Sequence, residues 1–168
     1  YAADIDGDGD MDVLGTADAN KITWWENDGS ESFTKRSVKD SYFGGAISVY
    51  AVDVDGDGDM DVLGAAKGAN DIAWWENDGS PATGLWPRHA IHTDWWGAWS
   101  VYAADVDGDG DMDVLGAAYG ADDITWWEND GTPADDDWSE HTIDADFDSA
   151  CSVYAVDVDG DGDMDVLG

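Results

Sequence analysis

The sequence DVDGDGDMDVLG at residues 53–64 is the most informative segment of this 168-residue chain. The same twelve residues begin again at Asp105 and at Asp157, and a copy with Ile in its second position begins at Asp4. From the starts at 4, 53, 105 and 157, the copies are 49, 52 and 52 residues apart. Self-similarity at a period of about fifty residues indicates a repeat architecture.

Each repeat contains four segments that are typical of short β-strands. In the second repeat we predict them at residues 48–53, 61–66, 71–76 and 86–92. The turn Asn-Asp-Gly after the third segment predicts a tight hairpin, because Asp-Gly tolerates positive backbone angles. Four antiparallel strands in about fifty residues fit one blade of a β-propeller. The block WWENDG that carries this turn begins at Trp24, Trp74 and Trp126, and the counterparts of the fourth strand are residues 33–39 and 138–144.

The predicted fold class is therefore all-β, an arc of about three four-stranded antiparallel blades plus an extra inner hairpin. The chain holds four copies of the first block and three of the second. A blade has two apolar faces and needs a neighbour on each. We expect either a longer polypeptide that completes the ring or self-association of two copies, which light scattering would distinguish. The single repeat domain spans 1–168, with units at about 1–46, 47–98 and 99–150 and a partial unit at 151–168.

Composition narrows the class of protein. The net charge is −34, with 40 acidic against 6 basic residues, yet 43% of residues are apolar and 12% aromatic. Disordered acidic chains are poor in aromatic residues, so the charge accompanies a folded core. Phosphates would be repelled, which excludes nucleic acid as a partner, and no apolar run is long enough to span a membrane. Cys151 has no partner for an intrachain disulfide, and we expect it to be a small buried side chain.

The acidic residues concentrate in a loop whose spacing suits a metal. Counted from Asp53, carboxylates stand at positions 1, 3, 5, 7 and 9, and Gly58 at position 6 permits a sharp bend. Hard oxygen donors at this density favour Ca²⁺, with the fifth donor at position 7 expected to be the backbone carbonyl. One such acidic run could be a solvated turn, but four runs at the same position of each repeat indicate metal sites. The candidate ligands to up to four Ca²⁺ are Asp4, Asp6, Asp8, Asp10, Asp12, Asp53, Asp55, Asp57, Asp59, Asp61, Asp105, Asp107, Asp109, Asp111, Asp113, Asp157, Asp159, Asp161, Asp163 and Asp165.

Other metals and another calcium motif fit less well. An EF-hand needs a bidentate Glu at position 12, where Gly64 stands in this loop. Mg²⁺ prefers a small octahedron and keeps its waters, and no His or Cys lies in the loops to hold Zn²⁺.

The pattern D-x-D-G-D-G-D-x-D-V, followed by W-x-N-D-G, resembles the FG-GAP and VCBS-type repeats over the whole chain. That family forms blades of bacterial secreted propellers and of the integrin α-subunit head. The resemblance implies Ca²⁺ in each loop between the first two strands of a blade. It also implies an extracellular, bacterial, secreted or cell-surface module without catalytic activity that recognises or adheres to glycan or protein ligands. The alternatives are an accessory propeller of a secreted, lyase-like carbohydrate-active enzyme, or a purely structural repeat.

The segment before each innermost strand differs between repeats, which marks a candidate ligand surface. It reads SYFGGAI at 41–47, TDWWGAW at 93–99 and ADFDSAC at 145–151. Trp95, Trp96 and Trp99 are the candidates for stacking on a sugar or a partner's apolar surface, with packing between blades as the alternative. For the WW pairs we expect core packing, because consecutive residues of a strand point to opposite faces.

Overall fold

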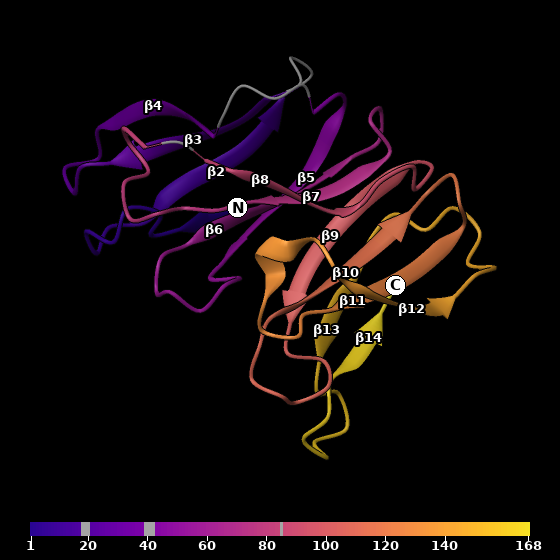
Figure 1. Cartoon of the computed structure of the whole chain (residues 1–168). Helices are drawn as coiled ribbons and strands as arrows, with labels where there is room; N and C mark the ends of the chain where they lie inside the picture. Colours follow the sequence, from indigo (N-terminus) through magenta and orange to yellow (C-terminus); the bar gives the residue numbers. More distant parts are fainter. Residues whose placement is uncertain (18–20, 39–42, 85) are drawn as a thin grey trace.

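The computed structural model describes residues 1–17, 21–38, 43–84 and 86–168, and it is an all-β, propeller-like arrangement of four antiparallel sheets. The sheets follow one another in chain order, from indigo to yellow in Figure 1. Among the described residues, no helix has the length and apolar character needed to cross a bilayer. The strands are β1 (Ala2–Ala3), β2 (Asp12–Ala17), β3 (Lys21–Asn27), β4 (Phe33–Val38), β5 (Ala46–Val52), β6 (Asp61–Ala66), β7 (Asp71–Trp75), β8 (Arg88–His92), β9 (Ala98–Ala104), β10 (Asp113–Ala118), β11 (Asp123–Glu128), β12 (Ser139–Asp144), β13 (Tyr154–Val156) and β14 (Asp165–Leu167), with a 3₁₀ turn at Pro133–Asp135.

Each of the first three sheets is a four-stranded meander, and the fourth is the hairpin β13–β14. The predicted second strand coincides with β6, while the other three predicted strands of this repeat differ from the structure at one or both ends. Strand β5 begins at Ala46 rather than at residue 48, because a bulge lets one extra residue enter the pairing with β6. Strand β8 begins at Arg88 rather than at residue 86, because Pro87 has no N–H to donate to the ladder.

The prediction of a tight Asn-Asp-Gly hairpin was wrong. Only the glycine of this turn, Gly79, has a positive φ, of 77°, and β7 and β8 are joined by the long segment 76–87. Asn77 starts the segment as an Asx turn, in which its Oδ1 accepts a hydrogen bond from the N–H of Gly79 at 3.2 Å. The same turn contacts the aspartate-rich loop of its sheet, because Asn77 is hydrogen-bonded to Asp61 and Met60.

Three apolar clusters hold the sheets together, one between each pair of successive sheets. The paired tryptophans supply both faces of a blade. Trp75 packs toward the first sheet and Trp74 toward the third, and both are at most 1% exposed. This alternation is what consecutive strand positions require. Gly116 makes room for such rings, since a Cβ there would lie 2.7 Å from Cζ3 of Trp95.

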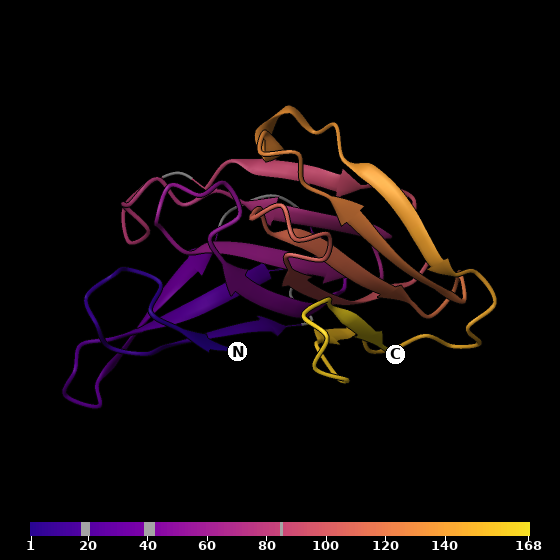
Figure 2. The same cartoon turned by 90° about the horizontal axis from the view of Figure 1, so that it is seen from below.

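The described sheets form an open arc, because none of the three clusters joins the first sheet to the fourth. Figure 2 shows the arc from below, with the N-terminal strand in indigo and the C-terminal hairpin in yellow. A ladder of tyrosine rings at the innermost strands runs along the arc, with centroids 4.5 to 4.8 Å apart, and its end members are about half exposed. The ladder consists of Tyr1, Tyr50, Tyr102 and Tyr154.

The expectation that Cys151 is buried was wrong: its side chain is exposed. It stands at the beginning of the fourth unit, where the described chain has a single hairpin and no further sheet to cover it.

Candidate metal centre

Each aspartate-rich loop connects the first two strands of a sheet and curls around its own first carboxylate. In the second loop the Asp53 carboxylate accepts hydrogen bonds from Gly56 N–H at 2.8 Å and from Gly58 N–H at 3.0 Å. Further along, Asp57 N–H donates to Asp55 at 3.1 Å and Asp59 N–H donates to Asp57 at 2.8 Å. These short-range hydrogen bonds satisfy the backbone of the loop and hold its carboxylates in place.

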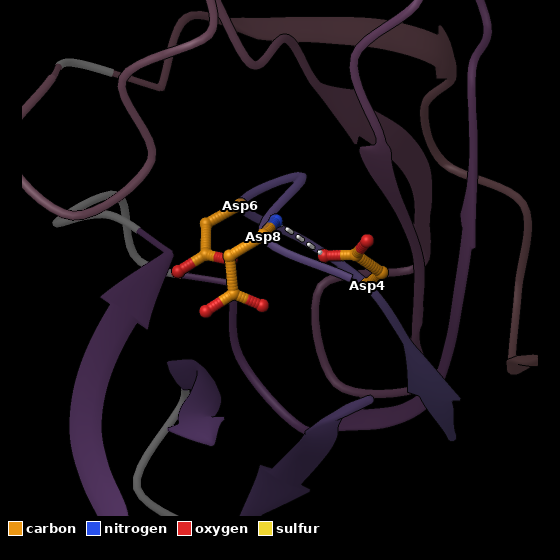
Figure 3. A group of neighbouring side chains, drawn as sticks. All are labelled: Asp4, Asp6 and Asp8. Atoms are coloured by element: carbon orange, nitrogen blue, oxygen red, sulfur yellow. Dashed lines mark hydrogen bonds between the residues drawn. The ribbon is translucent and has the colours of Figure 1, made fainter. Parts of the chain in front are cut away.

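The loop geometry gathers carboxylate oxygens within 4.8 Å of one another in all four copies. Figure 3 shows the first copy, with Asp8 N–H donating to Asp4. Two copies bring together positions 1, 3 and 5, and the other two bring together positions 1, 3 and 9. The groups are Asp4, Asp6 and Asp8; Asp53, Asp55 and Asp57; Asp105, Asp107 and Asp113; and Asp157, Asp159 and Asp165.

The aspartates at position 7 belong to none of these groups. The carboxylate of Asp59 lies instead beside Gly79 of the turn that follows β7, where a Cβ on the glycine would be 2.8 Å from Asp59 Oδ2. The same approach occurs between Asp111 and Gly131, at 3.1 Å. The absence of a side chain on the turn glycine therefore gives this carboxylate its space beside the turn.

In the first three loops the aspartate at position 9 is buried, unlike most of the loop. Asp61 is 0% exposed, and its two oxygens accept hydrogen bonds from Val54 N–H at 2.9 Å and from Asn77 N–H at 2.8 Å. Asp113 makes the equivalent pair of bonds with Val106 and Asn129. Position 9 thus ties the start of its loop to the end of the third strand in the same sheet.

The asparagine of the WWENDG block extends this connection to the preceding sheet. The Nδ2 of Asn77 donates to the carbonyl of Met60 in its own loop at 3.1 Å and to the carbonyl of Ile5 in the first loop at 3.2 Å. Asn129 donates to the Val54 carbonyl in the same way, at 3.0 Å. Sequence reasoning treated this asparagine only as a turn residue. Its repetition beside every WWE was the signal that could have identified the role.

Burial raises the pKa of the position 9 carboxyls of Asp61 and Asp113. Loss of hydration is the main cause, and the two backbone hydrogen bonds oppose it without cancelling it. The pKa of Asp61 rises to about 7 and that of Asp113 to about 6. Burial likewise raises the pKa of Asp6, Asp12 and Asp55. A divalent cation at these oxygens would favour the ionised form and reverse this shift.

We predict that a cation and protons compete for these carboxyls. Because the folded pKa of Asp61 is raised above its ordinary value, the metal-free fold loses stability as pH rises from about 4 to about 7. Ca²⁺ binding at pH 6 should therefore release roughly one proton per chain, and almost none at pH 8. Calorimetry in two buffers of different ionisation enthalpy measures this release; a binding heat independent of buffer at pH 6 contradicts the prediction.

The three candidate ligand tryptophans occupy three different environments. Trp95 is 6% exposed and packs edge-on against Trp127, with ring centroids 4.9 Å apart. Trp99 is half-buried beside Tyr119 and lies under the Lys67 ammonium, which is 4.4 Å from its ring centroid. Trp96 is 68% exposed and lines a cavity at the end of the sheets opposite the aspartate-rich loops.

Comparison with known proteins agrees with the repeat pattern. A family model described as an FG-GAP-like repeat matches residues 4–64, 53–116 and 113–168, so that its three matches cover nearly the whole chain. No curated protein matches the sequence. The residues that the model covers include all four aspartate-rich loops.

Proposed function

Since the chain belongs to the FG-GAP-like repeat family, we propose that it is a non-catalytic, calcium-binding propeller module that recognises glycan or protein ligands outside the cell. The observation that carries the metal part is the convergence of carboxylates within 4.8 Å in four equivalent loops. The recognition part is supported by the exposed Trp96, which lies in one of the variable segments between sheets and lines a cavity. A secreted or cell-surface location, in bacteria, fits the metal-binding and the recognition roles. Extracellular Ca²⁺ is near millimolar concentration, which saturates even weak sites.

Calcium fits the donor set better than other cations. The gathered ligands are carboxylate oxygens, which Ca²⁺ takes six to eight at a time in flexible geometry. In the second loop, Asp53, Asp55, Asp57 and Asp61 would hold the ion, together with the carbonyl of Asp59. An ion there would offset part of the negative charge of the loop and join the end of the innermost strand to the start of its neighbour.

The stoichiometry of Ca²⁺ tests the proposal. Four loops predict up to four ions per chain, and Asp57→Ala should remove one of them, since it deletes a gathered carboxylate. Asp137→Ala is the matched control, because Asp137 is an exposed aspartate outside the loops. Equilibrium dialysis or calorimetry counts the ions.

Equal losses from the two substitutions would mean that Ca²⁺ neutralises diffuse surface charge rather than occupying discrete sites. Loss of one ion from Asp57→Ala alone, with the count unchanged in Asp137→Ala, is the result the proposal requires.

A further inference from the structure

The cavity at Trp96 lies at the junction of three sheets. Its volume is about 420 Å³, within the range of small-molecule sites. It is formed by the turn after β6, the turn between β10 and β11, and the segments that lead into β9 and β13. Antiparallel strands place all these connections at the end opposite the aspartate-rich loops. The side chains that line it are Lys67, Trp96, Tyr119, Asp122, Asp148 and Ser149.

Trp96 lines this cavity and is 68% exposed. Its indole lies against Gly120, where a Cβ would be 2.8 Å from Trp96 Cδ2. Any other residue at 120 would displace the ring. The equivalent of Trp96 is Gly44 in the preceding repeat and Asp148 in the following one, so in the described chain this aromatic platform occurs once.

Hydrogen bonds within the chain hold the segments around the cavity in place without a ligand. The carbonyl of Asn70 accepts a hydrogen bond from Trp95 N–H at 2.7 Å, and its Oδ1 accepts one from Gly97 N–H at 2.9 Å. Asp122 holds the next segment in the same way, with its Oδ1 2.7 Å from Ser149 N. These hydrogen bonds hold the residues that flank Trp96 and Asp148 in the sequence. A site that is already rigid loses little conformational entropy when a ligand binds.

The polar groups in the cavity suit hydroxyl groups. The Asp148 carboxylate is exposed and, among the described residues, accepts no hydrogen bond, so it is free to accept from a ligand. Asp122 keeps its second oxygen available. Lys67 can donate to a ligand oxygen, and its ammonium lies beside the rings of Trp99 and Tyr119, at 4.4 and 5.4 Å from their centroids.

We infer that this cavity binds one residue of a neutral pyranose sugar, with a C–H face on Trp96 and hydroxyl groups on Asp122, Asp148 and Lys67. The electron-rich face of the indole attracts polarised C–H groups. The two carboxylates and the net charge of −34 disfavour uronates and sialylated glycans. The Lys67 ammonium already lies beside the rings of Trp99 and Tyr119, and it would repel the positive charge of a basic peptide. This inference rests on the recognition role proposed above and specifies its ligand class.

Saturation-transfer NMR on the full 168-residue chain in Ca²⁺ tests the inference. The probes are the neutral methyl pyranosides of glucose, galactose and mannose, with glucuronate as the acidic and lysine amide as the basic comparison. We expect transfer to ring protons of at least one neutral pyranoside. Trp96→Ala should weaken its binding at least tenfold, and Trp96→Phe should retain most of it, since the smaller ring still offers an aromatic face.

Phe33→Ala is the matched control, because Phe33 is a half-exposed aromatic residue on β4, away from the cavity. It should leave pyranoside binding unchanged. The inference is overturned if no neutral pyranoside binds, if glucuronate or lysine amide binds in preference, or if Trp96→Ala and Phe33→Ala have equal effects.

The Ca²⁺ count of each variant separates this inference from the function proposed above. An unchanged count without sugar binding overturns the sugar site alone. A missing Ca²⁺ response in the unmodified chain overturns the metal part of the proposed function, whatever the sugars do.

Discussion

Excess chelator is expected to lower the melting temperature of this protein by roughly 10–25 °C. At ten times the dissociation constant, a bound ion stabilises the folded state by about 1.4 kcal/mol, so four loops together supply about 6 kcal/mol. That is comparable with the whole stability of an ordinary domain. For a chain of this size, each kcal/mol moves the melting temperature by about 2–4 °C.

The physical cause is the repulsion that the ions remove. Two carboxylates about 4 Å apart repel by roughly 4 kcal/mol at an effective dielectric of 20, and each loop holds several within 4.8 Å. The described chain offers no basic side chain to these groups, since its Lys and Arg ion pairs lie elsewhere, at Arg36–Glu26 and Arg88–Asp71.

Scanning calorimetry with and without chelator measures this shift, at constant ionic strength. Restoring Ca²⁺ should recover the melting temperature, and the same concentration of Mg²⁺ should recover less of it, because Mg²⁺ gives up its waters reluctantly. A melting temperature that does not change in excess chelator would show that Ca²⁺ does not stabilise this fold.

Asp61→Ala is expected to be the most damaging single substitution in the loops, with a loss of about 3–6 kcal/mol in Ca²⁺. It deletes a position 9 carboxylate and leaves the N–H groups of Val54 and Asn77 buried without an acceptor. Each unsatisfied buried group costs about 1–3 kcal/mol, and the lost ion adds its own share. Chemical denaturation in Ca²⁺ gives the difference in unfolding free energy.

Asp165→Ala provides the matched control for Asp61→Ala. Asp165 has the same position in the fourth loop, but it is exposed and its carboxylate accepts a single backbone hydrogen bond, from Val158 at 2.9 Å. The fourth sheet has no third strand to supply the second donor. We expect Asp165→Ala to cost less than half as much. Equal costs would show that position 9 acts through the ion alone and not by joining the loop to the third strand.

Local sequence order was enough to predict the repeat, the strand β6, the phase of the four acidic loops and the alternation of Trp74 and Trp75 between two neighbouring sheets. These features depend on contacts within one repeat or on the two-residue period of a strand, and both can be read from residues that are close in the sequence.

The contacts that a residue makes with a neighbouring sheet could not be predicted from the sequence and are seen only in the folded chain. Asn77 reaches the carbonyl of Ile5, 72 residues away, and no pattern inside a repeat encodes that partner. Trp95 and Trp96 are adjacent in the sequence, yet one is buried against Trp127 and the other lies open on Gly120. Each repeat supplies half of every interface, so the environment of a side chain at its edge is settled only when the next repeat packs against it.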